Sequence, residues 1–158
     1  MRPNCIREPN TYTVNGRNEK AVRQVPIQVD VFHFDRLVVA IGNGDVTLAE
    51  YGKFVGDLVQ QGLMHYRKII DVTRTDSSAI NPQVLMAFDA RLREYSKSRR
   101  GPLAIVVPRD RGEGAFEFKL HTSAERPIEV FRSIHDARNW VMRLPVGEAL
   151  AKKPGEAK

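Results

Sequence analysis

A polar loop between a predicted strand and a predicted helix carries the side chains best suited to bind a ligand or a partner. In the segment YRKIIDVTRTDSSAINPQ, residues 66–83, the apolar positions of 69–72 predict a short buried strand. A helix start follows, since Asn81 is a favourable N-cap and Pro82 suits the first helical position. Open α/β folds place ligands and switches at such junctions. We therefore predict a partner-binding surface made by Arg74, Asp76, Ser77, Ser78 and Asn81.

Two further groups of residues could take part in binding. The loop RDRGEG, residues 109–114, follows the most apolar strand in the chain and could extend the same surface. Small α/β domains can also hold an apolar ligand between a helix and the sheet. The side chains predicted to line such a pocket are Met86, Phe88 and Phe116, for which packing in the core is the first explanation.

No residues have the spacing of a catalytic or metal site. Asp71 is the one carboxylate placed among apolar neighbours, and we expect it to accept hydrogen bonds from backbone donors rather than to act as a base. The turn at 42–45 lacks the Gly-Lys-Ser/Thr ending of a phosphate loop, and the single Cys5 has no partner. Metal-binding spacing is also missing from His33, His65, His121 and His135. We predict no enzymatic activity, no metal and no cofactor.

The composition is that of one globular domain with a basic balance. The chain has 158 residues, of which 42% are hydrophobic and 28% charged, with a formal net charge of +6. Much of the excess positive charge lies in 91–111, where we favour a solvated helix end and loop because no aromatic residues alternate with the charges. Weak nucleic-acid binding through 91–111 is the third functional hypothesis. With no long apolar run and no signal peptide, we predict a cytoplasmic protein without a membrane span.

The apolar periodicity predicts the element order β-β-α-β-α-β-α-β-α. The first two strands should pair antiparallel, and the later strands alternate with helices and should be parallel in one mixed sheet of about five strands. Thr47 and Glu50 form a capping box before the first helix. In the last two helices we expect Phe116, Leu120 and Ile134 to face inward, although 116–118 also fits a strand. The predicted strands are 27–31, 37–41, 68–73, 103–107 and 127–131, and the predicted helices are 48–61, 82–98, 115–122 and 134–144.

The ends of the chain differ in composition from the middle. Residues 1–24 mix Asn, Pro, Arg and Thr without an apolar period, and residues 146–158 are rich in Ala, Lys, Gly and Glu. Such segments bury too little apolar surface to offset the entropy lost on ordering. We predict a flexible leader at 1–24, one domain at 25–145 and a flexible tail at 146–158.

Three local patterns resemble the STAS-type fold. They are GDVTLAEY at 44–51, KIIDVTRTDSS at 68–78 and IEVFRSIHDARNW at 128–140. In particular, the chain resembles small bacterial proteins described as similar to the sporulation anti-sigma factor antagonist. The resemblance implies a mixed sheet with helices packed on it, no cofactor and a role in binding a protein partner. A more distant resemblance, to CRAL-TRIO-like domains, implies the alternative role of carrier or sensor of a small apolar ligand.

The resemblance also implies a possible switch in the polar loop. Classical antagonists carry an Asp-Ser-Ser-Gly type motif at this junction, and a kinase phosphorylates its second serine. Asp76, Ser77 and Ser78 match the first three positions, which makes Ser78 the candidate phosphoacceptor. Ala79 to Pro82 then stand where the family has glycines, so Ser78 would precede the helix by about one turn.

Overall fold

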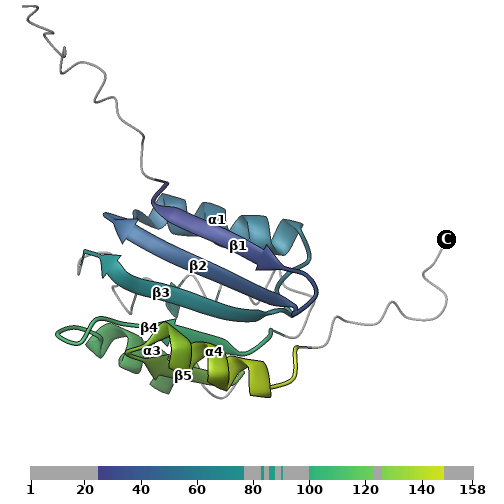
Figure 1. The fold of residues 1–158 in the computed structure, drawn as a ribbon. Helices are drawn as coiled ribbons and strands as arrows, with labels where there is room; N and C mark the ends of the chain where they lie inside the picture. The colour runs from purple at the N-terminus through teal and green to yellow at the C-terminus, as the bar shows by residue number, and fades with distance from the viewer. Residues whose placement is uncertain are drawn as a thin grey trace, which may run out of the picture.

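Five strands form one sheet, and helices cover both of its faces (Figure 1). The computed structural model describes residues 25–76, 100–122 and 126–147, together with the single positions 83, 86, 87 and 90. The strands are β1 (Ile27–Phe32), β2 (Leu37–Gly44), β3 (Arg67–Thr75), β4 (Leu103–Val106) and β5 (Ile128–Phe131). The helices are α1 (Leu48–Gln60), α3 (Glu113–Thr122) and α4 (Ile134–Arg143).

The strands lie side by side in the order in which they occur along the chain. β1 pairs antiparallel with β2, and β2, β3, β4 and β5 run parallel to one another. The predicted α/β class, the antiparallel first pair and the parallel remainder are confirmed. The predicted helix at 82–98 lies largely outside the described residues. The four of its positions that are described, 83, 86, 87 and 90, are helical.

The alternation of side chains along the strands divides the core between the two faces. On one face, Val38 and Ala40 of β2 pack against α1, and residues of β4 pack against α3. On the other face, Ala137 and Val141 of α4 pack against β3 and β4. Figure 1 shows α4 in front of the sheet and α1 behind β1 and β2. Helix α4 packs on β3, β4 and β5, and on the same face of β1 the side chains of Gln28, Asp30 and Phe32 are exposed among the described residues.

Helix α1 follows its sequence signals closely. The hydroxyl of Thr47 accepts a hydrogen bond from the Glu50 amide at 3.2 Å, and the Glu50 carboxylate accepts one from the Thr47 amide at 2.8 Å. This reciprocal pair satisfies two amides that the first helical turn leaves free. Phe54, Val55 and Leu58 are buried against the sheet. The predicted capping box is confirmed.

The inward faces predicted for the last two helices are wrong at three positions. Phe116, Leu120 and Ile134 are 41%, 78% and 43% exposed. In α3 the sheet instead contacts the stripe made by Ala115, Phe118 and Thr122, which also has the i, i+3, i+4 spacing of a helix face. The helix carries apolar side chains on more than one side, so its sequence alone does not determine which side is buried. The helical conformation itself, chosen over a strand, is confirmed.

A salt bridge joins α3 to β5. Lys119 Nζ lies 2.6 Å from Glu129 Oε1, and this hydrogen bond is the main reason that the pKa of Glu129 is held below its ordinary value of 4.5. A lowered carboxyl pKa contributes stability above pH 4.5, and that stability is lost as the pH falls through the lower pKa of the folded state.

We expect Glu129→Gln to remove this part of the pH dependence. Because both side chains are about one third exposed, the loss at neutral pH should stay below ~1 kcal/mol. Urea unfolding at a series of pH values measures the effect. Lys119→Met should flatten the same part of the curve, since it removes the donor and keeps the carboxyl. An unchanged slope in both variants would show that the pair does not couple to folding.

At the amino-terminal ends of β3 and β4, backbone groups make close contacts around a buried lysine. Lys68 is 4% exposed, and its Nζ donates to the carbonyl oxygens of Met64 at 2.5 Å and Tyr66 at 2.8 Å. Burial, with smaller contributions from Arg126 and Arg100, lowers the pKa of the Lys68 ammonium well below its ordinary value. The amide of Gly101 donates to the same Met64 carbonyl, at 3.0 Å. This end of the sheet therefore has a structural role in the fold.

Candidate functional site

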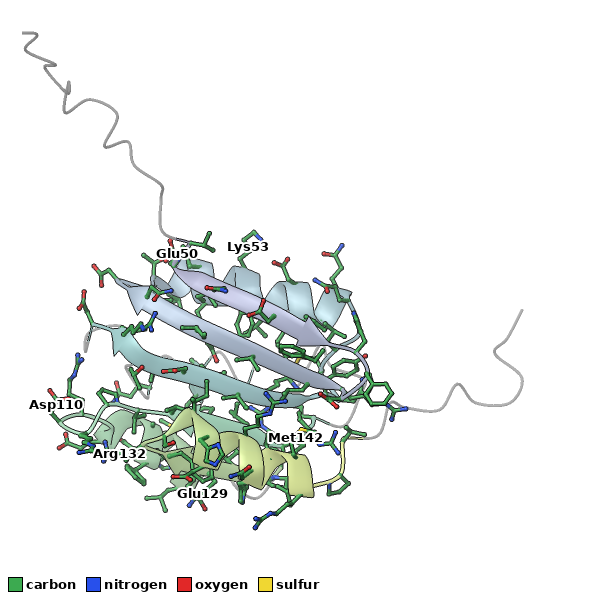
Figure 2. The ribbon with its side chains drawn as sticks, in the orientation of Figure 1. Glu50, Lys53, Asp110, Glu129, Arg132 and Met142 are labelled. Carbon is green, nitrogen blue, oxygen red and sulfur yellow. The ribbon has the colours of Figure 1, made fainter. Side chains whose placement is uncertain are left out.

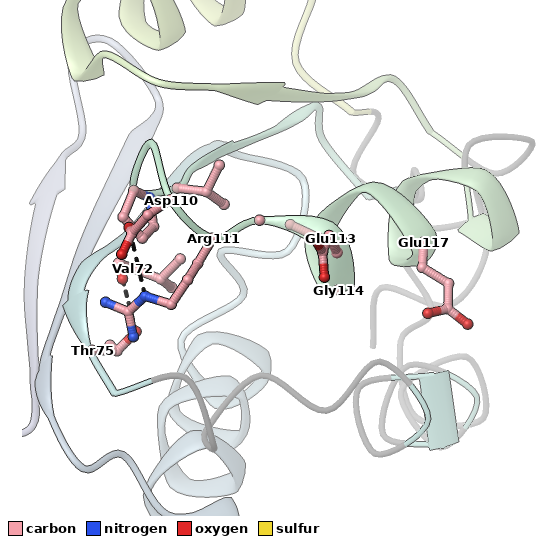
Figure 3. A pocket seen from close by; sticks show the side chains of 11 residues that line it. Val72, Thr75, Asp110, Arg111, Glu113, Gly114 and Glu117 are labelled. Atoms are coloured by element: carbon pink, nitrogen blue, oxygen red, sulfur yellow. Dashed lines mark hydrogen bonds and ion pairs between the residues drawn. The ribbon is translucent and has the colours of Figure 1, made fainter.

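A cavity opens at the carboxyl ends of β3 and β4, where parallel α/β sheets commonly bind their ligands (Figure 3). Its volume is about 330 Å³. The end of β3 forms one wall, and the segment that joins β4 to α3 forms the other. The lining residues are Val72 and Thr75 of β3, Val107 and Pro108 after β4, residues 110–115, and Glu117 of α3.

A β-bulge shapes the β3 wall of this cavity. The pairing of β2 with β3 is regular as far as Ile41 and Asp71, then shifts so that Asn43 lies opposite Arg74. The carboxylate of Asp71 accepts hydrogen bonds from the Thr73 amide at 2.9 Å and from its hydroxyl at 2.7 Å. Asp71 therefore satisfies backbone and hydroxyl donors within the bulge, as its position in the sequence predicted. The bulge also explains why β3 continues two residues beyond the predicted Thr73.

The bulge turns Thr75 inward and leaves its neighbours outside. Thr75 is 4% exposed, and its hydroxyl donates to the Val72 carbonyl at 2.7 Å. It packs so closely on β2 that a Cβ added at Gly42 would lie 2.5 Å from its methyl group. Arg74 and Asp76 are exposed and do not line the cavity. In the sequence they lie on either side of Thr75, which lines the cavity.

The opposite wall is held in place from the end of β5. The Nη1 atom of Arg132 donates to the carbonyl oxygen of Pro108 and, at 2.7 Å, to that of Arg111. Its guanidinium carbon also lies 5.7 Å from the centre of the Phe116 ring. Figure 2 shows Arg132 and Asp110 at the same end of the sheet. Arg132 thus fixes the conformation of the segment 108–111.

We expect Arg132→Ala to release this segment without unfolding the domain. The variant loses two hydrogen bonds from an ionised donor, but the donor is exposed, so the free energy of unfolding should fall by only about 1 kcal/mol. Hydrogen exchange of the amides in 109–112 should become clearly faster, while exchange in α1 stays unchanged. Equal exchange in 109–112 would mean that Arg132 does not hold the wall.

Arg111 is the polar side chain that reaches into the cavity. Figure 3 shows its guanidinium directed across the cavity towards Val72 and Thr75 of β3. Its Nε lies 3.8 Å from Asp110 Oδ1, beyond hydrogen-bond distance, and has no hydrogen-bond acceptor among the described residues. Asp110, Glu113 and Glu117 also line the cavity, so it offers both donors and acceptors. A group with an oxygen acceptor could satisfy the guanidinium of Arg111.

The cavity lining combines hydroxyl, carboxylate and guanidinium groups. The lining includes the Thr75 hydroxyl and the carboxylates of Asp110, Glu113 and Glu117, and no cysteine, histidine or lysine. Across the described ranges, no cluster of three His, Cys, Asp or Glu side chains could hold a metal ion. No helix within those ranges is long and apolar enough to span a bilayer.

The predicted site residues fall into different environments. Arg74 and Asp76 are exposed beside the cavity, whereas Ser77, Ser78, Asn81 and Phe88 lie outside the described residues. Met86 is partly buried against the core beneath α3, and Phe116 lies on the surface under Arg132. Sequence reasoning included the 109–114 loop but missed Arg111 and Thr75 as individual residues.

Comparisons with known proteins concern the fold. The chain matches no known family of sequences, and no curated protein is significantly similar to it. An uncharacterised protein of the DUF3478 family from Shewanella loihica, which has a SpoIIAA-like fold, is 16% identical with a TM-score of 0.50; the match covers 73% of this chain and 91% of that one. An anti-sigma factor antagonist from Mycobacterium paratuberculosis is 14% identical with a TM-score of 0.48, over 75% and 96% of the two chains. The likeness to the Shewanella protein confirms the predicted fold, and this chain has the SpoIIAA-like, STAS-type α/β fold.

Proposed function

We propose that this protein is a non-enzymatic regulatory domain that binds a protein partner at the carboxyl ends of strands β3 and β4. The observation that carries the proposal is the cavity between β3 and the 107–115 segment, into which Arg111 projects. This cavity adjoins the exposed residues Arg74 and Asp76, where the sequence predicts the partner-binding loop. The predicted surface would continue through Ser77, Ser78 and Asn81.

Each part of the surface would make a different kind of contact. Arg111 would donate to a carbonyl or hydroxyl oxygen that the partner inserts into the cavity, and Thr75 would pack against the inserted group. Arg74 and Asp76, at the solvated rim, would contribute more to selectivity than to affinity. A phosphate on Ser78 would add negative charge close in sequence to Arg74, which gives the loop a means of regulation.

Affinity purification with matched variants tests this proposal. Tagged wild-type protein, Arg111→Ala and Arg74→Ala with Asp76→Ala would each be used as bait in a lysate of the native host. Arg109→Ala is the matched control, because it removes an arginine from the same loop that does not line the cavity. Quantitative mass spectrometry should find a protein captured by the wild type and by the control.

We expect Arg111→Ala to reduce that capture by about tenfold or more, since a hydrogen bond to an ionised group contributes ~1.5–3 kcal/mol. The double variant should also weaken capture, and neither should lower the melting temperature, because Arg74 and Asp76 are exposed. Equal capture by all four baits would place the partner elsewhere. Loss of binding together with loss of stability would assign these residues a structural role instead.

A carrier of a small apolar ligand is the second candidate function. Val72, Val107 and Ala115 give the cavity apolar walls, and Met86 packs against the same part of the core. Native mass spectrometry of freshly purified protein should then find a bound apolar molecule that denaturation releases. A bare chain would count against the carrier, and the same measurement would detect a phosphate on Ser77 or Ser78.

A further inference from the structure

The edge of the sheet formed by β1 is regular and carries exposed apolar side chains, and no described strand covers its outer side. Among the described strands β1 pairs with β2 alone, and its pairing runs from Ile27 to Phe32 without a register shift. In Figure 1 β1 forms the outer border of the sheet. Half of the large apolar side chains exposed in the described residues lie on β1 or beside it. They are Val25 at 65%, Val29 at 38%, Phe32 at 44% and Phe34 at 101%.

The hydrogen bonds to β2 determine which backbone groups of β1 point outward. The Asn43 amide donates to the Pro26 carbonyl at 2.8 Å, so the backbone groups of Pro26 face β2. Antiparallel pairs alternate, so every second residue after Pro26, beginning with Gln28, also bonds β2. The N–H and C=O groups of Ile27, Val29 and Val31 therefore point away from the sheet.

Two of the usual devices that protect an edge strand, an outward-facing proline and a β-bulge, are missing from β1. Proline blocks an edge because it lacks an N–H, but the N–H that Pro26 lacks would have faced β2. There is no bulge in β1, and none of its residues is lysine. The outward backbone groups from Ile27 to Val31 thus form an uninterrupted row of donors and acceptors.

We propose that a second copy of this chain pairs with this edge, antiparallel and centred on Val29, to join the two sheets. Val29 then faces Val29 of the second copy, and Ile27 faces its Val31, and each of these pairs exchanges both backbone hydrogen bonds. On the open face of the sheet, Gln28 lies opposite Asp30 of the second copy, and Phe32 lies opposite its Pro26.

Charge and overlap select this register. Only odd-numbered residues present outward backbone groups, so a symmetric pair must be centred on a residue. Centring on Asp30 would place two carboxylates directly opposite each other, which is unfavourable. Centring on Gln28 would leave Phe32 beyond the paired region. With Val29 at the centre, each Asp30 can accept a hydrogen bond from a Gln28 amide, and the overlap is longest.

Introducing a charge at position 28 provides a direct test by sedimentation equilibrium of the full chain. At high concentration the wild-type mass should approach twice 17.9 kDa. Gln28→Glu sets two like-charge pairs across the dimer and should raise the dissociation constant about tenfold. Gln28→Lys creates two opposite-charge pairs across the dimer instead and should lower the dissociation constant. Asn139→Asp makes the same amide-to-carboxylate change on an exposed position of α4 and should have no effect.

Cross-linking tests the register independently. In a Cys5→Ser background, Gln28→Cys with Asp30→Cys should form intermolecular disulfides on mild oxidation, because non-hydrogen-bonded pairs have Cα atoms about 4.5 Å apart. Circular dichroism confirms that each variant is folded. A chain that stays monomeric without cross-links overturns the proposal, as does a dimer that responds to none of the Gln28 changes. A monomer whose edge binds a different peptide would also refute the second copy as the occupant.

Discussion

Gly101→Ala is expected to lower the free energy of unfolding by about 3 kcal/mol or more, the largest effect of any single substitution considered for this chain. A Cβ at this position would lie 2.2 Å from the Tyr66 carbonyl oxygen and 2.5 Å from that of His65. These are backbone atoms, so no side chain can rotate away to make room. Urea unfolding followed by circular dichroism measures the loss.

The cost is large because the segment 64–66 is held from several sides. The Gly101 amide donates to the Met64 carbonyl at 3.0 Å, and the Gly147 amide donates to the His65 carbonyl at 2.8 Å. The Lys68 ammonium also bonds the carbonyls of Met64 and Tyr66. Moving the backbone away from a new methyl group would weaken these bonds around the buried Lys68 side chain.

Gly56→Ala is the matched control for Gly101→Ala. Gly56 lies within α1, and a Cβ there would meet no atom within 4 Å. Alanine is favoured over glycine in a helix, so this variant should gain ~0.5–1 kcal/mol of stability. Similar stability of the two variants would contradict the close approach of Gly101 to 64–66.

The sequence predicts the sheet well because each strand has a local signal. Alternating apolar residues predict β1, and the continuous apolar run of β4 predicts a central strand. The end of β3 is predicted less well, since its last two residues depend on the bulge. That bulge needs the hydrogen bonds of Asp71 and the space left by Gly42, which lies on a different strand. The residue pattern of one strand cannot predict a contact that depends on a second strand.

The candidate site is harder to predict than the fold for the same reason. The sequence identifies 109–114 as a charged, glycine-rich loop, but it does not indicate which side chain enters the cavity. Arg111 faces β3 because Arg132, at the end of β5, holds the carbonyls of Pro108 and Arg111. Exposed arginines in loops are common, and nothing in the local sequence separates Arg111 from Arg109. The distinction comes from contacts between distant segments.

Gly112→Ala is expected to destabilise the fold by about 2 kcal/mol and to deform the cavity. Gly112 has a φ of +154°, and a Cβ there would lie 2.9 Å from Val107 Cγ2 and 3.1 Å from Arg132 Nη1. Alanine would therefore be strained and would push against the side chain that holds the 108–111 segment. Urea unfolding measures the stability, and hydrogen exchange of the amides in 109–112 should become faster.

Gly44→Ala separates backbone strain from this contact. Gly44 also has a positive φ, +62°, but a Cβ there would meet no atom within 4 Å, so the cost should be only ~1 kcal/mol. Exchange in 109–112 should stay at its wild-type rate in that variant. If both variants lost the same stability and left exchange unchanged, Gly112 would matter only for its conformation. Faster exchange in Gly112→Ala alone, with weaker capture of the partner, would tie the binding surface to the position of Arg111.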